Sequence, residues 1–95
     1  MVPNVFALYQ NYPNPFNPTT QIRYDLPEYQ FVSIAIYDVM GRNIRNLMNK
    51  NQAAGFHSVR WDAKNDIGEG VAAGMYIYTI QAGEFKATKK MVLLK

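Results

Sequence analysis

The chain has 95 residues, which is long enough for one domain with its own core. It has no cysteine, and this excludes disulfides, Cys-ligated zinc, iron–sulfur clusters and thiol catalysis. Its formal net charge is +3, and the whole excess lies in residues 84–95, because residues 1–83 hold equal numbers of basic and acidic side chains. A nucleic-acid surface usually spreads cations over a face and a membrane-spanning helix needs roughly 20 apolar residues, so we expect neither a nucleic-acid partner nor a membrane span.

Proline and glycine divide the chain into two parts. All five prolines lie within residues 3–27, and all six glycines lie between Gly41 and Gly83. Proline fixes φ and removes a backbone donor, whereas glycine permits tight turns. The sequence therefore predicts one domain over residues 1–95, in which residues 1–18 form a Pro/Asn-rich extended entry segment.

Apolar and polar residues then alternate in short stretches separated by turns, a pattern typical of antiparallel strands. Strands are predicted for residues 21–26, 31–37, 43–48, 58–62, 76–81 and 85–94. Only residues 44–50 are also compatible with a helix, which would be marginal at that length. The pattern predicts an all-β fold, an immunoglobulin-like antiparallel β-sandwich of about seven strands. A β-barrel is the main alternative.

Few residues could carry catalysis. His57 is the only histidine, and Ser33 and Ser58 are the only serines. Neighbouring residues of a strand point to opposite faces, so His57 and Ser58 cannot form a nucleophile–base pair within one strand. We therefore predict no catalytic residue, no cofactor and no enzymatic activity.

The loop of residues 61–70 contains several side chains with oxygen ligands. These candidate calcium ligands are Asp62, Asn65, Asp66 and Glu69. Their spacing differs from the alternating ligands of an EF-hand loop, and Lys64 places a positive charge among them. The preferred interpretation is an Asx-rich turn whose side chains accept hydrogen bonds from backbone N–H groups, and no metal site is predicted.

Aromatic residues could form a platform for carbohydrate or bases. The candidates, near predicted strand ends or opposite the aliphatic face, are Tyr9, Tyr12, Phe16, Tyr29, Phe31, Tyr37 and Phe56. Small sandwiches always expose some apolar side chains, so scattered aromatic residues need no ligand to explain them.

The last residues of the chain are first basic and then apolar. Lysines on a closing strand protect an exposed sheet edge, while alternate apolar residues, either Met91 and Leu93 or Val92 and Leu94, face the core. The alternative is that a terminal strand also serves as an address for another protein.

Three stretches together resemble a known family. The first stretch comprises residues 8–20 (LYQNYPNPFNPTT) and 22–27 (IRYDLP), the second residues 36–42 (IYDVMGR), and the third residues 73–78 (AGMYIY) with 89–95 (KKMVLLK). In order and spacing, they are similar to C-terminal sorting domains of the type IX secretion system. The resemblance covers the chain from about Val5 to Lys95. Trp61-Asp62 with residues 74–76 is also similar to the related immunoglobulin-like domain of flagellar hook-capping proteins, although Ala63 stands where the family often has glycine.

The resemblance implies a non-catalytic signal domain of a larger exported protein. Such a domain would be fused to an N-terminal cargo, recognised by the outer-membrane translocon after folding in the periplasm of a Gram-negative bacterium, and in many members removed by a sortase-like peptidase. The cargo would then be secreted or attached to the cell surface. Residues 1–4 lack the features of a signal peptide, and Met1 is interpreted as a start placed upstream of an excised domain.

The family's signal maps onto two stretches of this chain. The expected translocon-recognition residues are Gly74, Met75, Tyr76, Lys89, Lys90, Met91, Val92, Leu93, Leu94 and Lys95. A terminal strand could bind a receptor by strand addition. The alternative function is an accessory immunoglobulin-like module that binds glycans or spaces domains at the cell surface.

Overall fold

Seven strands and their connecting turns account for the chain in the computed structural model, which describes residues 1–94. The strands are β1 (Ala7–Leu8), β2 (Thr20–Leu26), β3 (Gln30–Asp38), β4 (Asn43–Gln52), β5 (Gly55–Trp61), β6 (Gly74–Ala82) and β7 (Phe85–Leu93). The helix with which residues 44–50 were also compatible does not form, because these residues lie inside β4 and pair with β3. Pairing with a neighbouring strand outweighs the slight helical preference of a short segment.

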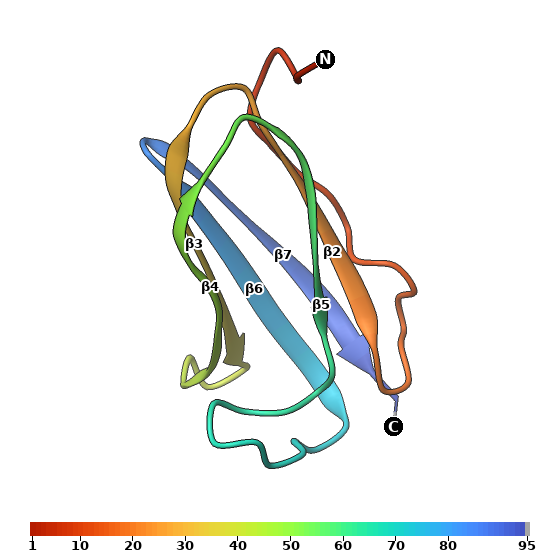
Figure 1. Cartoon of the computed structure of the whole chain (residues 1–95). Helices are drawn as coiled ribbons and strands as arrows, with labels where there is room; N and C mark the ends of the chain where they lie inside the picture. The colour runs from red at the N-terminus through yellow and green to blue at the C-terminus, as the bar shows by residue number, and fades with distance from the viewer. Residues whose placement is uncertain (95) are drawn as a thin grey trace.

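The strands form two antiparallel sheets (Figure 1). One sheet has the order β1-β2-β5 and the other has the order β4-β3-β6-β7. Each sheet is separate, so the structure is a sandwich and not a closed barrel. The prediction of an all-β, immunoglobulin-like sandwich of seven strands is confirmed.

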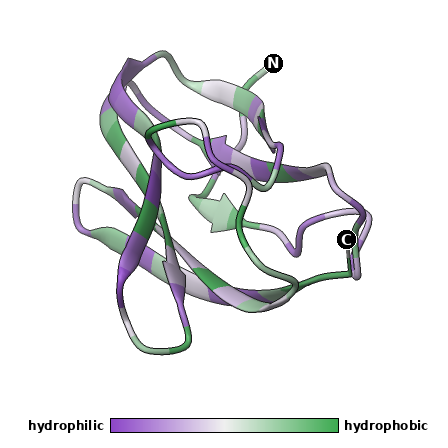
Figure 2. Cartoon of the chain, turned by 90° about the horizontal axis from the view of Figure 1, so that it is seen from below, coloured by the Kyte–Doolittle hydropathy of each residue, from purple (hydrophilic) through white to green (hydrophobic). Residues whose placement is uncertain are grey.

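The core lies between the sheets and is built mainly by alternate residues of β2, β3, β6 and β7, while β4 contributes only partly buried side chains. Figure 2 shows the resulting bands of hydrophobic and hydrophilic residues along the strands. The largest fully buried side chains include Trp61, Tyr24 and Tyr78. Every buried side-chain nitrogen or oxygen among the described residues has a hydrogen-bond partner, as expected for a well-packed interior.

The entry segment, residues 1–18, folds back along the sandwich. It contributes β1, which pairs with β2, and it continues past the first residues of β2 towards β7. Phe16 is only 1% exposed and belongs to the hydrophobic core. Phe16 is therefore no candidate for an exposed aromatic platform, because its ring fills space beside Trp61, at a centroid distance of 5.8 Å.

Within residues 1–94, the structure contains no helix that is long and apolar enough to cross a membrane.

Candidate functional site

The two stretches expected to carry recognition meet in one β-hairpin. In the register of β6 and β7, Met75 lies opposite Val92 and Tyr76 lies opposite Met91. Directly opposed residues of antiparallel strands point to the same face. The hairpin therefore sorts the candidate residues into an inner and an outer set.

The inner set is structural. Tyr76, Met91 and Leu93 are all buried in the core. The ring of Tyr76 packs edge-to-face on Trp61 with a centroid distance of 5.4 Å, and its hydroxyl donates to the carbonyl oxygen of Ala72 at 2.6 Å. These side chains cannot contact a partner while the domain is folded. Of the two registers that the sequence left open, the one with Met91 and Leu93 inside is correct.

The outer set forms an exposed apolar surface. We call it the hairpin-end patch and define it as Met75, Ile77, Lys90, Val92 and Leu94. Met75 is 45% exposed and Leu94 is 58% exposed, whereas Ile77 and Val92 are half-buried and Lys90 is exposed. The ammonium group of Lys90 gives the patch a positive charge. Lys89 is half-buried and lies opposite Tyr78, and Lys95 lies outside the described residues.

Gly74 shapes the backbone at the start of this hairpin. Its φ is +142°, a conformation that residues with a Cβ rarely adopt, yet a Cβ placed there would have no neighbour within 4 Å. The glycine is therefore needed for backbone conformation and not for space. A side chain at this position would strain the start of β6 next to Met75.

The outer edge of β7 is largely covered by the entry segment. Val92 donates its N–H to the side-chain oxygen of Asn14 at 3.0 Å and accepts the N–H of Phe16 at 2.9 Å. Leu94 donates its N–H to the carbonyl oxygen of Phe16 at 2.8 Å, and the Gln10 side chain donates to the carbonyl oxygen of Lys90 at 2.6 Å. Backbone groups of alternate residues point outward on an edge strand. The structure gives no such edge partner to the backbone groups of Lys86 and Thr88, and none to the N–H of Lys90, among residues 1–94.

Tyr78 fixes the entry segment from inside the sandwich. Its hydroxyl donates to the carbonyl oxygen of Tyr9 and accepts the N–H of Asn11, both at 2.8 Å. Burial raises the pKa of the Tyr78 hydroxyl to about 12, and the hydrogen bond from Asn11 opposes that shift. Sequence reasoning missed this role, although the tyrosine and the Asn/Pro block both belong to the stretches that carried the family resemblance.

The oxygen-rich loop is held by protein groups. The guanidinium of Arg45 lies 3.5 Å from the Asp62 carboxylate and 3.6 Å from the Asp66 carboxylate. The side-chain oxygen of Asn65 accepts the N–H groups of Ile67 and Glu69, as expected for an Asx-rich turn. Within residues 1–94, no group of three His, Cys, Asp or Glu side chains is arranged to hold a metal ion.

His57 and Ser58 occupy opposite faces of β5. The His57 ring stacks on Tyr24 at a centroid distance of 5.3 Å, and its Nε2 lies 2.8 Å from the carbonyl oxygen of Ala53. Ser58 is exposed on the other face. The geometry gives the histidine a packing role, since it brings neither Ser33 nor Ser58 to the ring.

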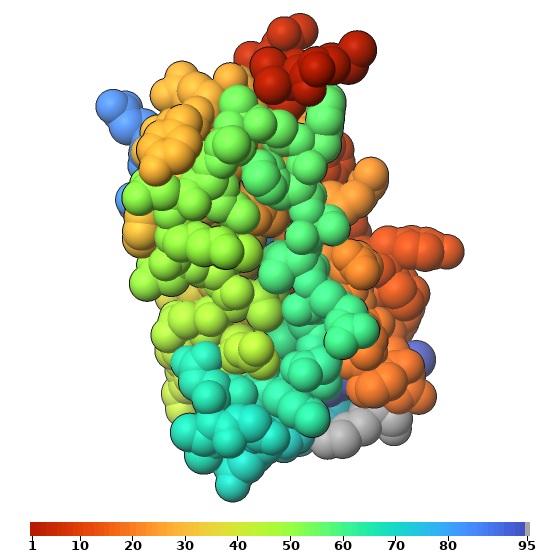
Figure 3. Space-filling view, in the orientation of Figure 1, coloured from red at the N-terminus to blue at the C-terminus, as the bar shows by residue number. Residues whose placement is uncertain are grey.

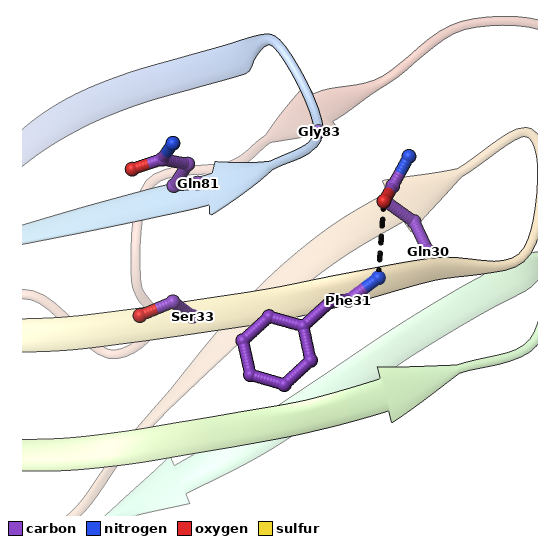
Figure 4. A pocket seen from close by; sticks show the side chains of 5 residues that line it. All are labelled: Gln30, Phe31, Ser33, Gln81 and Gly83. Atoms are coloured by element: carbon purple, nitrogen blue, oxygen red, sulfur yellow. Dashed lines mark hydrogen bonds between the residues drawn. The ribbon is translucent and has the colours of Figure 1, made fainter.

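The remaining aromatic residues are distributed over the molecule and do not form one platform. Phe31 lies beside a shallow hollow of about 380 Å³ on the outer face of the four-stranded sheet (Figure 4). The hollow is lined by Gln30, Phe31, Ser33, Gln81 and Gly83. Tyr9 and Tyr12 lie on the outer face of the other sheet, because they pair with the outward-facing positions of β2. Tyr29 and Phe56 are exposed, and Tyr37 is half-buried.

A family model and several solved structures match this chain. The model described as "Secretion system C-terminal sorting domain" matches residues 10–94. Among curated proteins, no sequence matches significantly. The crystal structure of dimeric latent PorU from Porphyromonas gingivalis matches with a TM-score of 0.72 and 19% identity, covering 94% of this chain and 9% of that one.

Two further structures share the fold. PorZ, described as an essential bacterial surface component of the type IX secretion system of Porphyromonas gingivalis, matches with a TM-score of 0.60 and 20% identity over 95% of this chain and 11% of that one. The Pseudomonas fluorescens alkylpurine DNA glycosylase AlkC, bound to DNA, has a TM-score of 0.57 and 11% identity over 95% of this chain and 30% of that one. The chain thus spans about a tenth of the length of PorU and PorZ, and these likenesses establish the fold alone.

Proposed function

This chain belongs to the family of secretion system C-terminal sorting domains. We propose that the hairpin-end patch, at the open end of the β6–β7 hairpin, is the surface that the type IX translocon recognises. The family's domains are sorting signals for type IX secretion, so the chain is part of a secreted or cell-surface protein of a Gram-negative bacterium. Sorting domains are generally non-catalytic. They work through the secretion machinery and through attachment to a cargo protein.

The proposed recognition residues fall into two roles. Gly74, Tyr76, Met91 and Leu93 hold the hairpin in shape, and Met75, Lys90, Val92 and Leu94 touch the receptor. Lys89 adds positive charge to the same strand, and Lys95, which lies outside the described residues, remains among the proposed recognition residues. The observation that carries the proposal is the exposure of Met75 and Leu94 on a hairpin whose inner side chains are buried. Large exposed apolar side chains that lie together typically mark interaction surfaces.

The receptor contact is proposed to be made mainly by side chains. Strand addition needs a free edge, and the entry segment occupies the edge of β7 from Lys90 to Leu94. The lysines of β7 would steer the domain towards an acidic receptor surface, which raises association rates. The proposal names three partners of the domain: an outer-membrane translocon, a sortase-like peptidase and an N-terminally fused cargo protein.

The decisive test must change recognition without unfolding the domain. Deleting residues 91–95 would not be a clean test. It removes two core side chains, Met91 and Leu93, and it leaves the backbone N–H and carbonyl of Phe16 without their hydrogen-bond partners. We choose the double variant Met75→Asp with Leu94→Asp in a reporter fused to the chain. Both side chains are exposed, so the fold should persist, and two carboxylates should repel an apolar or acidic receptor surface.

The matched control is Tyr29→Asp with Phe56→Asp, which changes two exposed aromatic residues outside the hairpin-end patch. Fractionation of a type IX-competent bacterium should find the first variant in the periplasm, with export reduced by at least tenfold, and the control outside the cell. Thermal unfolding of both purified domains verifies that they are folded. Normal export of the Met75/Leu94 variant would refute the assignment of the patch.

A further inference from the structure

The outer face of the three-stranded sheet carries a second polar and aromatic surface. Alternation along β2 and β5 places Gln21 and Arg23 of β2, and Ser58 and Arg60 of β5, on this face. In the register of the two strands, Arg23 lies opposite Ser58 and Gln21 lies opposite Arg60. The two arginines are therefore diagonal neighbours, a position from which long side chains can reach a common ligand.

The entry segment adds two tyrosines to the same face. Tyr9 donates its N–H to the carbonyl oxygen of Arg23, and Tyr12 and Gln21 exchange both backbone hydrogen bonds. Figure 3 shows β2 and the entry segment along the right side of the molecule, next to β5. Residues from three segments thus share one surface, which lies on the opposite side of the sandwich from the hairpin-end patch.

Arg23 is oriented by an aromatic ring, and no carboxylate within residues 1–94 forms an ion pair with it. Its guanidinium carbon lies 5.1 Å from the centroid of the Tyr9 ring, and the Tyr9 hydroxyl in turn donates to the buried carboxylate of Asp25. All ion pairs found within residues 1–94 use Arg42 or Arg45. Arg23 and Arg60 are therefore free to bind an anion. The stacked guanidinium of Arg23 loses less freedom on binding than an unsupported side chain.

A hollow of about 350 Å³ opens beside these groups. It is shallow and is lined by the side chains of Tyr12, Gln21, Arg23 and Ser58. The Tyr12 side chain is 80% exposed, so its ring can stack on a ligand. A hollow of this size has room for a sugar ring, and its aromatic and polar side chains supply both a stacking surface and hydrogen-bonding groups.

We propose that this hollow, the Tyr12–Arg23 site, binds an acidic saccharide. The C–H face of a pyranose ring would stack on Tyr12, as sugars do on exposed aromatic rings. A carboxylate or phosphate on the sugar would bind between Arg23 and Arg60 by charge-assisted hydrogen bonds, while Gln21 and Ser58 bind hydroxyl groups. A nucleic-acid strand fits less well, because a backbone needs a longer track of cations and the lysines of β7 lie in the other sheet. This site is independent of translocon recognition.

The test is an NMR titration of the ¹⁵N-labelled chain with tetragalacturonate, with the neutral tetrasaccharide of galactose as the uncharged probe. Tetragalacturonate should shift the amides of Tyr12, Arg23 and Ser58, and the neutral sugar should bind at least tenfold more weakly. Arg23→Gln and Tyr12→Ser should each weaken binding by about tenfold. The charge-matched control is Lys86→Gln, on the exposed side of β7, which should leave the affinity unchanged.

Several outcomes would overturn the proposal. One is the absence of shifts with tetragalacturonate, and another is equal binding of the neutral sugar. Equal weakening by Arg23→Gln and Lys86→Gln would mean that only net charge attracts the ligand. If inorganic phosphate shifted the same amides with the same affinity, the site would bind anions and not saccharides.

Discussion

The hydroxyl group of Tyr78 hydrogen-bonds to Asn11 and Tyr9, which lie 67 and 69 residues before it in the chain. It lies inside the sandwich, and its two hydrogen bonds fix the backbone of the entry segment at Tyr9 and Asn11. Because the side chain is fully buried, removing the hydroxyl leaves the carbonyl of Tyr9 and the N–H of Asn11 without partners. Buried groups that lose a partner carry a larger cost than the bond itself was worth.

We predict that Tyr78→Phe destabilises the domain by about 1 to 3 kcal/mol. Urea unfolding followed by the fluorescence of Trp61 measures this change. Tyr37→Phe is the control, since that hydroxyl makes no hydrogen bond within residues 1–94 and its loss should be nearly neutral. A Tyr78→Phe domain as stable as the unmodified one would show that the hydroxyl does not hold the entry segment.

The same hydroxyl should make stability depend on alkaline pH. The pKa of Tyr78 is raised from 10.0 to about 12 in the folded state, so the folded state retains the proton more strongly than the unfolded state. This contribution is fully present below pH 10 and is lost as pH rises to about 12, at about 1.4 kcal/mol for each unit of pKa difference. Urea unfolding at pH 9 to 12 should show a steeper loss for the unmodified domain than for Tyr78→Phe. Equal slopes would contradict the assignment.

At the level of elements, the entry segment and β7 act as one unit. Phe16 inserts its ring into the core beside Trp61, and its backbone hydrogen-bonds to Val92 and Leu94 on both sides of Leu93. The sequence predicted both segments but not their contact. Local patterns report which face of a strand is buried, whereas a contact between residues 16 and 93 depends on the whole topology.

Replacing Phe16 by Ala should detach the entry segment from β7. Loss of a buried ring costs about 3 to 5 kcal/mol, so urea unfolding should show a large loss of stability. Hydrogen exchange of the Val92 and Leu94 amides should accelerate more than that of amides in the central strand β3. Equal acceleration at all of these amides would contradict a local detachment.

A milder variant separates the edge contact from core packing. Asn14→Ala removes only the hydrogen bond from the Val92 N–H to the exposed Asn14 side chain, at a cost of about 1 kcal/mol. Exchange should then accelerate at Val92 and stay unchanged at Leu94, whose partner is the Phe16 carbonyl. Protection of Val92 that persists in this variant would show that Asn14 does not cover the edge.

β4 shows where the sequence pattern was insufficient. Its burial alternates irregularly because two register shifts interrupt its pairing with β3, and irregular spacing is what made a helix compatible with residues 44–50. The strands with regular alternation, such as β2 and β6, were predicted correctly because every second residue faces the core. Periodicity thus identifies a strand only where its register is unbroken.

For the whole molecule, the family resemblance and the strand pattern predicted the sandwich and the secretion function. They could not separate the exposed candidate residues from the buried ones, because burial of Tyr76, Met91 and Leu93 depends on packing against Trp61 and the entry segment. The outer patch emerged only from the register of β6 and β7. The charge excess noted in the sequence is divided in the structure, with Lys86 and Lys90 exposed and Lys89 half-buried.

The most direct test of the central claim is whether residues 1–95 suffice to export an unrelated cargo. A periplasmic reporter fused to the N-terminus of this chain is expressed in a type IX-competent bacterium and in the same strain without its outer-membrane translocon. The account predicts that the reporter reaches the medium or cell surface in the first strain and stays in the periplasm in the second. Retention in both strains, or export in both, would contradict it.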